Sequence, residues 1–343
     1  MSKRRRAKSK TVAYVFPGQG NLKAGAGKAA YGYSSKSRLV INTADKILGR
    51  PLSKLCFEGP EADLRKTANA QLAAVVTALA ELSVLCDLKK LDDGDLRFII
   101  KDKRVAFLAG HSVGYYAALV AAGVLTLRQC LLILTVRAGA MSLACEINPG
   151  KMLALIDPDK EKINELNSVP DAWVANYNSD GQVVYGGRTK AMEEMEQFVR
   201  QNKIADKVLP LGTEGAFHTP LMEPAVPLLS AVIAQIEFGN PAVPIIANSN
   251  ALPITTWQEA KEEAVKQICS VVHWVQSLEF FDAHGVKTTI EMGGEVLSRM
   301  FARGSKMATL KRFISMSAGL IKQVAAREKK KFQKKLIKSK DSK

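Results

Sequence analysis

The chain has 343 residues, of which 47% are hydrophobic and 24% charged, an ordinary composition for a soluble globular protein with a sizeable core. Its five cysteines are odd in number, widely spaced and without a CxxC pair, so they indicate neither a disulfide framework nor a zinc site and favour a reducing cytosol. Most of the net charge of +16 lies at the ends: residues 1–10 carry six positive side chains, and residues 327–343 carry nine against two negative ones.

These two basic tails allow several interpretations. They are either solvated, disordered extensions, or segments that steer an acidic partner or weakly attract nucleic acid or an anionic membrane. No specific nucleic-acid binding is expected, because the body of the chain is close to neutral. A secretory signal is not expected either, since Pro17 and Gly18 interrupt the short apolar run 11–16. The longest apolar region, 117–144, is broken by Arg128 and Arg137, which predicts two core helices and no membrane span.

Strands and helices alternate in the first part of the chain. We expect strands at 11–16 and 104–109, and helices at 37–48, 70–88, 116–122 and 127–144. This alternation predicts a doubly wound α/β sheet.

From residue 151 the pattern changes. We expect strands at 152–156, 173–178, 182–185 and 207–211, and helices at 159–166 and 191–201. The resulting βαββαβ order is typical of a ferredoxin-like subdomain. After Thr213 the chain is expected to return to the large domain and to end in helices that run into the basic tail.

The segment Gly110-His111-Ser112-Val113-Gly114 joins an expected strand to an expected helix. A serine on such a sharp turn exposes its hydroxyl above a sheet, and the flanking glycines let the backbone turn. The helix that begins here directs free N–H groups at the serine, which suits the oxyanion of an acyl-transfer intermediate. The pattern indicates a nucleophile elbow, although it also suits a glycine-rich turn with an incidental serine.

Two further motifs accompany the elbow in the same chain: Val-Phe-Pro-Gly-Gln-Gly at 15–20 and Gly-Ala-Phe-His-Thr-Pro-Leu-Met at 215–222. Together the three motifs resemble the malonyl-CoA:acyl carrier protein transacylase family, from residue 11 to about residue 301. The resemblance implies an α/β-hydrolase-like large domain with a parallel sheet (11–145 and 213–310) and an inserted small ferredoxin-like subdomain (146–212). A basic tail (1–10) precedes these parts, and a C-terminal helix with a basic tail (311–343) follows them.

The resemblance also implies an activity. The family transfers malonyl from malonyl-CoA to the phosphopantetheine thiol of an acyl carrier protein through an ester on the serine, Ser112 here, in fatty-acid or polyketide synthesis. We therefore expect a cytoplasmic, monomeric acyltransferase that needs no metal or bound cofactor. Acyl carrier proteins are acidic, so the basic tails suit the steering of such a partner.

The general base is sought among only four histidines. His111 neighbours the nucleophile, and its side chain is expected to point away from the path of the serine. His273 lies in an apolar segment and His284 at an expected helix end, so both have structural explanations. The remaining one, His218, matches the catalytic histidine of the family, which takes the serine proton and returns it to the leaving thiol.

The other catalytic groups come from the resemblance. It places the oxyanion hole at the backbone N–H groups of Gln19 and Val113. A nucleotide-binding loop at Gln19 is not favoured, because neither glycine-rich phosphate motif fits there. No Asp or Glu between the serine and the base stands out as the third triad member. In the family a glutamine backbone carbonyl orients the histidine, and this position aligns with Gln267, which alternatively is only a polar helix residue.

Arg137 interrupts an apolar helix, where a guanidinium is costly unless a carboxylate meets it. In the family the matching arginine binds the malonyl carboxylate, and the alternative is a salt bridge to a protein carboxylate. Phe217 resembles the malonyl-selecting form of its motif, whose ring disfavours methylmalonyl. Met141 and His111 complete the substrate-binding residues that the resemblance implies.

Two positions depart from the family pattern. Tyr115 replaces the usual glutamate after the elbow, and its phenol could reshape the entrance or move the helix start. Residues 293–297, Gly-Gly-Glu-Val-Leu, replace the usual Gly-Pro-Gly-Lys-Val-Leu. Two alternative functions stay open: an acyl hydrolase on the same scaffold, against which Arg137 argues, and a catalytically silent docking protein of an assembly line.

Overall fold

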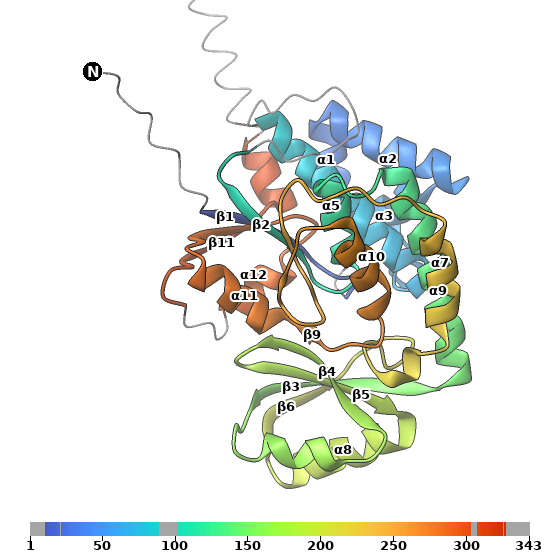
Figure 1. Cartoon of the computed structure of the whole chain (residues 1–343), viewed down its shortest axis with the longest axis vertical. Helices are drawn as coiled ribbons and strands as arrows, with labels where there is room; N and C mark the ends of the chain where they lie inside the picture. Colours follow the sequence, from blue (N-terminus) through green and yellow to red (C-terminus); the bar gives the residue numbers. More distant parts are fainter. Residues whose placement is uncertain (1–10, 21, 89–101, 303–306, 325, 327–343) are drawn as a thin grey trace, which may run out of the picture.

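A computed structural model of the chain describes residues 11–20, 22–88, 102–302, 307–324 and 326. It is a mixed α/β structure with two sheets, and Figure 1 shows the larger, helix-rich part above the smaller sheet. The basic tails, and the steering role considered for them, lie outside the described residues.

The large sheet has six strands in the order β11-β10-β1-β2-β7-β8. All neighbouring pairs are parallel except the last, β7 with β8, which is antiparallel. β1 and β2 therefore lie side by side at the centre of the sheet. Because they are parallel, their C-terminal ends lie next to each other. The strands are β1 (Val12–Phe16), β2 (Val105–Gly110), β7 (Ile245–Ile246), β8 (Pro253–Ile254), β10 (Thr288–Glu291) and β11 (Arg312–Ser315).

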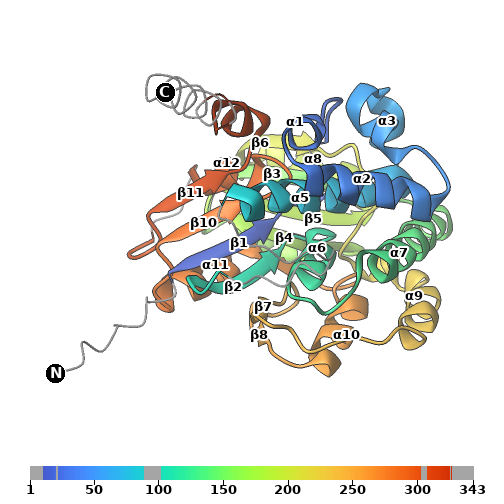
Figure 2. The same cartoon turned by 90° about the horizontal axis from the view of Figure 1, so that it is seen from above.

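Helices cover both faces of this sheet because strand residues alternate between two cores. Tyr14 and Phe16 point into the main core with α1, α2, α5, α6 and α7, whereas Ala13 and Val15 pack with Trp274 and the rest of α11. Figure 2 shows α1, α2 and α5 gathered over one face. The helices are α1 (Lys28–Tyr33), α2 (Ser35–Leu48), α3 (Leu52–Glu58), α4 (Glu61–Leu64), α5 (Thr67–Leu88), α6 (Gly114–Ala121), α7 (Leu127–Ile147), α9 (Ala225–Ala234), α10 (Trp257–Lys266), α11 (Trp274–Ala283) and α12 (Val296–Ala302), with a short 3-10 turn at Pro220–Met222.

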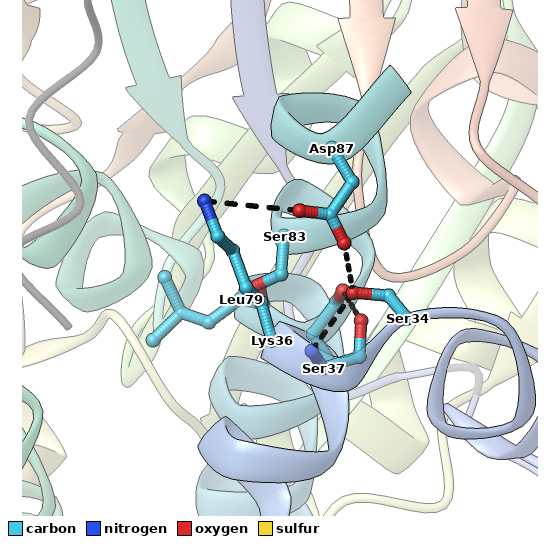
Figure 3. A network of polar contacts seen from close by, with 7 residues as sticks. Ser34, Lys36, Ser37, Leu79, Ser83 and Asp87 are labelled. Atoms are coloured by element: carbon cyan, nitrogen blue, oxygen red, sulfur yellow. Dashed lines mark hydrogen bonds and ion pairs between the residues drawn. The ribbon is translucent and has the colours of Figure 1, made fainter. Parts of the chain in front are cut away.

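Two of the described helices, α5 and α7, are long and apolar enough to cross a membrane. Their most apolar stretches are 83% and 56% buried inside the protein, as expected of core helices. Figure 3 shows how α2 is fastened to the end of α5. Asp87 accepts a hydrogen bond from the Ser34 hydroxyl and lies 3.7 Å from Lys36 Nζ, while the Ser37 hydroxyl donates to the Ala80 carbonyl at 2.6 Å. These contacts fix α5, which carries a partner of Arg137 described below.

The small sheet has the order β6-β3-β5-β4-β9 and is antiparallel except for the β4–β9 pair. One face packs against α8, and the other, with Met152, Ala154 and Val184, joins the main core. The small sheet therefore forms a wall of the space above β1 and β2. Its elements are β3 (Gly150–Pro158), β4 (Ala172–Ser179), β5 (Gln182–Arg188), α8 (Thr189–Gln201), β6 (Ala205–Pro210) and β9 (Val272–His273).

The structure corrects three expectations. The helix expected at 159–166 is a 3-10 helix at Ile163–Ser168. The region after Thr213 contains short strands besides helices, and β9 joins the small sheet instead of the large one. The segment 311–343, expected to be a C-terminal helix followed by a tail, begins with β11, which pairs with β10 in the large sheet, and the helix follows only at residues 318–324. Strands of two to four residues carry too little alternation to be recognised from sequence.

Candidate active site

Ser112 lies on the tight turn between β2 and α6. Its φ of 52° is in the left-handed region, which is uncommon for a residue with a side chain. A Cβ on Gly110 would lie 2.0 Å from the Gly114 backbone, and one on Gly114 would lie 2.2 Å from the Phe16 carbonyl oxygen. Glycine at both positions therefore lets the turn close and lets it touch the end of β1.

His218 is hydrogen-bonded on both sides of its ring. Its Nε2 lies 2.7 Å from Ser112 Oγ, and its Nδ1 lies 2.8 Å from the backbone carbonyl oxygen of Gln267. Because a carbonyl only accepts, Nδ1 carries the proton and the Nε2 lone pair faces the serine hydroxyl. The structure thus brings together the three residues predicted as catalytic, although His218 lies 106 residues after Ser112 and 49 residues before Gln267 in the chain.

Burial and, to a lesser extent, the positive charge of Arg137 lower the pKa of His218 to about 3. The bond to Gln267 acts in the opposite direction, but it is the smaller influence. The imidazole is therefore neutral at physiological pH. A neutral ring with its lone pair directed at a serine hydroxyl can accept that proton.

The backbone N–H groups of Gln19 and Val113 lie on the two loops that meet at the serine. Neither N–H has a hydrogen-bond partner among the described residues. Gln19 lines the same cavity as Ser112, and Val113 precedes the first turn of α6. Two free donors beside a nucleophile can stabilise a developing oxyanion.

A cavity of about 350 Å³ opens beside Ser112 and His218, between the large sheet and the small one. Arg137 reaches it from α7 and is buried, with 1% of its surface exposed. Its Nη1 donates to Gln71 Oε1 on α5 at 2.6 Å, and its guanidinium lies 5.5 Å from the Tyr116 ring. Nε and Nη2 are buried without a partner, and within the described chain no carboxylate meets them. The salt-bridge alternative thus has no support here, and the site suits a ligand anion.

This arrangement is matched by known proteins. Residues 13–292 fit the acyl transferase domain family. The chain belongs to this acyl transferase family. It is 34% identical over 293 residues to the malonyl CoA-acyl carrier protein transacylase of Bacillus subtilis (strain 168), covering 84% of this chain and 88% of that protein.

Solved structures of the acyl transferase family agree. The acyl-carrier-protein-S-malonyltransferase from Bartonella henselae superposes with a TM-score of 0.81 at 32% identity, covering 92% of this chain and 98% of that one. A type II polyketide acyl-carrier protein in complex with its malonyl-transacylase gives a TM-score of 0.79 at 29% identity, covering 89% and 95%. The family predicted from the three motifs is confirmed.

Other residues predicted to bind substrate also reach the cavity of this acyl transferase. Phe217, Met141 and His111 all line it. His111 Nε2 lies 2.8 Å from Asn178 Oδ1, so its side chain is held against the small sheet. Burial lowers the pKa of His111, which favours the neutral ring.

Sequence reasoning missed the amide side chains that the small sheet contributes. Asn176, Asn178 and Gln182 line the cavity, and Asn178 Nδ2 donates to Gln182 Oε1 at 3.2 Å. Two asparagines at alternate positions of one strand share a face, and that regular spacing was the available signal.

The two departures from the family pattern lie in different places. Tyr115 is fully buried and is absent from the cavity wall, so it does not reshape the entrance, and α6 begins at Gly114. In the late loop, Gly293 has a φ of 98° and its N–H donates to Glu81 Oε2 at 2.6 Å. Val296, within this stretch, and Arg299, just after it, line the cavity, so this departure lies close to the site.

Proposed function

We propose that this protein transfers a malonyl group from malonyl-CoA to the phosphopantetheine thiol of an acyl carrier protein. The observation that carries the proposal is the buried guanidinium of Arg137, unpaired at two nitrogens, in the same cavity as the Ser112–His218 pair. A hydrolase for simple acyl groups has no use for a buried cation there. Relatives named as malonyl CoA-acyl carrier protein transacylases support the same substrate.

The first half-reaction loads the enzyme. Malonyl-CoA binds with its carboxylate on Nε and Nη2 of Arg137 and its thioester carbonyl at Ser112. As Ser112 Oγ attacks, its proton passes to His218 Nε2, and the carbonyl of Gln267 stabilises the resulting imidazolium through Nδ1–H. The N–H groups of Gln19 and Val113 hold the oxyanion. The C–S bond then breaks, and His218 returns the proton to the CoA thiolate.

The second half-reaction is the same chemistry in reverse, with a different thiol. The phosphopantetheine thiol of the carrier gives its proton to His218 and attacks the malonyl-serine ester, and Ser112 recovers its proton as the ester breaks. The solved complex of a malonyl-transacylase with an acyl-carrier protein supports this partner class. The reaction requires no group besides the side chains and backbone already named.

We also propose a domain division. Residues 11–145 and 213–310 with β11 form an α/β-hydrolase-like domain, and residues 146–212 form a ferredoxin-like subdomain. The parallel strands around β1 support the first assignment. The order β6-β3-β5-β4 supports the second, because the outer strands of a βαββαβ unit pair beside its first and third strands. The five free cysteines among the described residues are consistent with the cytoplasmic location that we propose.

The proposal is tested by incubating the protein with malonyl-CoA and measuring its intact mass, with Ser112→Ala as the control. A malonyl adduct that persists in water and is absent from the control supports the transferase. An adduct that is lost rapidly to water indicates a hydrolase. No adduct at all indicates a silent docking protein and overturns the proposal.

A further inference from the structure

One helix, α10, contacts the elements that carry both reacting side chains. Tyr115 and Tyr116, at the start of α6, donate their hydroxyl protons to the carbonyls of Ala260 and Ala264, at 3.0 and 2.7 Å. These two carbonyls lie one turn from each other on α10. Both tyrosines are fully buried, so these two bonds fasten the helix that follows the nucleophile to α10. Tyr115 is the residue that replaces the usual glutamate of the family.

A side-chain relay reaches the nucleophile itself. Asn248, in the loop after β7, accepts a hydrogen bond from the Ser112 N–H through Oδ1 at 2.9 Å. Glu263 of α10 holds this loop: its Oε1 accepts from the N–H groups of Asn248 and Ser249, at 2.7 and 3.0 Å, and its Oε2 accepts from the Ser249 hydroxyl at 2.6 Å. Glu263 is 4% exposed and Asn248 is 3% exposed, so water competes little for these bonds.

The C-terminal end of the same helix holds the base. Gln267 is the residue that caps α10, and its carbonyl accepts from His218 Nδ1. The next carbonyl, that of Ile268, accepts from the His218 N–H at 3.1 Å. His218, like Ser112, has a left-handed backbone, with a φ of 64°. Residues with side chains adopt this conformation only where their surroundings hold them in it.

We propose that α10 is the element that holds the nucleophile Ser112 and the base His218 in the relative position that the reaction needs. Asn248 and Glu263 are positioning residues, which hold the Ser112 backbone in its left-handed conformation. The inference rests on the proposed function for its substrate, but it concerns the reactivity of Ser112 towards any acylating or phosphonylating reagent. Without the Asn248 acceptor, the Ser112 N–H loses its anchor and the turn relaxes. Ser112 Oγ then moves away from His218 Nε2 and from the N–H groups of the oxyanion hole.

The test measures the rate at which a fluorophosphonate labels Ser112, a reaction in which Oγ bonds to phosphorus and fluoride leaves. Asn248→Leu removes the acceptor at nearly constant volume and should slow labelling by about 10- to 100-fold, since a displacement of about 1 Å at a reacting atom costs about 10²-fold. Asn248→Asp keeps an acceptor oxygen, and it loses no bond because Asn248 Nδ2 has no hydrogen-bond partner in the described part of the chain. It should label at least tenfold faster than Asn248→Leu.

Asn250→Leu is the matched control. Asn250 lies in the same loop and accepts from the Leu252 N–H at 2.9 Å, but among the described residues it makes no hydrogen bond to the elbow, so its variant should label at the wild-type rate. Equal rates for Asn248→Leu and the wild type, or equal losses in Asn248→Leu and Asn250→Leu, overturn the inference. If Asn248→Leu does not fold, Asn248→Ala removes the same acceptor and takes its place in each comparison.

A second readout separates positioning from substrate binding. With malonyl-CoA, Asn248→Leu should lower kcat by the same factor while KM changes by less than about twofold, because the relay touches no substrate-binding residue. A raised KM at unchanged kcat contradicts the inference. The labelling assay needs no malonyl-CoA, so failure of the wild type to load malonyl refutes the proposed function alone.

Discussion

Replacing Arg137 by alanine tests the substrate assignment. The wild-type guanidinium offers Nε and Nη2, both buried and unpaired, to the malonyl carboxylate. A hydrogen bond to a charged group contributes about 1.5 to 3 kcal/mol, and each 1.4 kcal/mol is about a factor of ten. We therefore expect Arg137→Ala to lower kcat/KM for loading from malonyl-CoA by roughly 10- to 100-fold. Loading from acetyl-CoA should hold or rise, because acetyl has no carboxylate to lose.

The quantity to measure is the ratio of the two loading rates, by intact mass at short times. Arg128→Ala is the control, since Arg128 is an exposed arginine on the same helix and outside the cavity, and its ratio should stay at the wild-type value. A thermal melt completes the assay. If Arg137→Ala loses activity towards both substrates equally and melts earlier, Arg137 is structural and the reasoning from its unpaired nitrogens is refuted.

Three further predictions concern the base, the turn and a buried acid. Because the neutral form of His218 is the base and its pKa lies near 3, kcat/KM for loading should show no step near 6.5; a step there contradicts the burial argument. Gly114→Ala should destabilise the fold by about 1–3 kcal/mol, because the added Cβ overlaps with the end of β1. Gly139 is exposed on α7 with nothing near the position of a Cβ, so Gly139→Ala should stabilise the fold by about 0.5–1 kcal/mol. Urea unfolding measures both, and the opposite order of stabilities would contradict the close contact between the turn and β1. Burial raises the pKa of Glu81 to about 8, so its stabilising contribution is present below 4.5 and is lost as the pH rises through 8. Glu81→Gln should remove this part of the pH dependence of the melting temperature, and an unchanged slope would show that the carboxyl is already ionised.

The local motifs of the site could be recognised in the sequence because each depends on neighbouring residues. The elbow needs small residues on both sides of Ser112, and the glycines at 110 and 114 are visible in the sequence at those positions. Likewise, the helix positions of Arg137 and Met141 follow from apolar spacing alone. The family resemblance then predicted that these separate motifs come together in one active site.

Contacts between distant segments could not be predicted in this way. The partner of Arg137 is Gln71, which lies 66 residues earlier on another helix, and no spacing rule connects them. The same holds for Asn248, which is 136 residues from Ser112, and for β11, whose four residues belong to the sheet only through pairing with β10. Such features arise from tertiary packing, which local periodicity does not encode.

The central claim is that a malonyl ester on Ser112 is passed to a carrier thiol. The most direct measurement isolates the malonyl-loaded protein, locates the adduct by peptide mass mapping, and then adds an acyl carrier protein either with or without its phosphopantetheine. The account predicts an adduct on the Ser112 peptide that is transferred only to the carrier bearing phosphopantetheine. An adduct on another residue, or loss of the malonyl group at the same rate with both carriers, would contradict it.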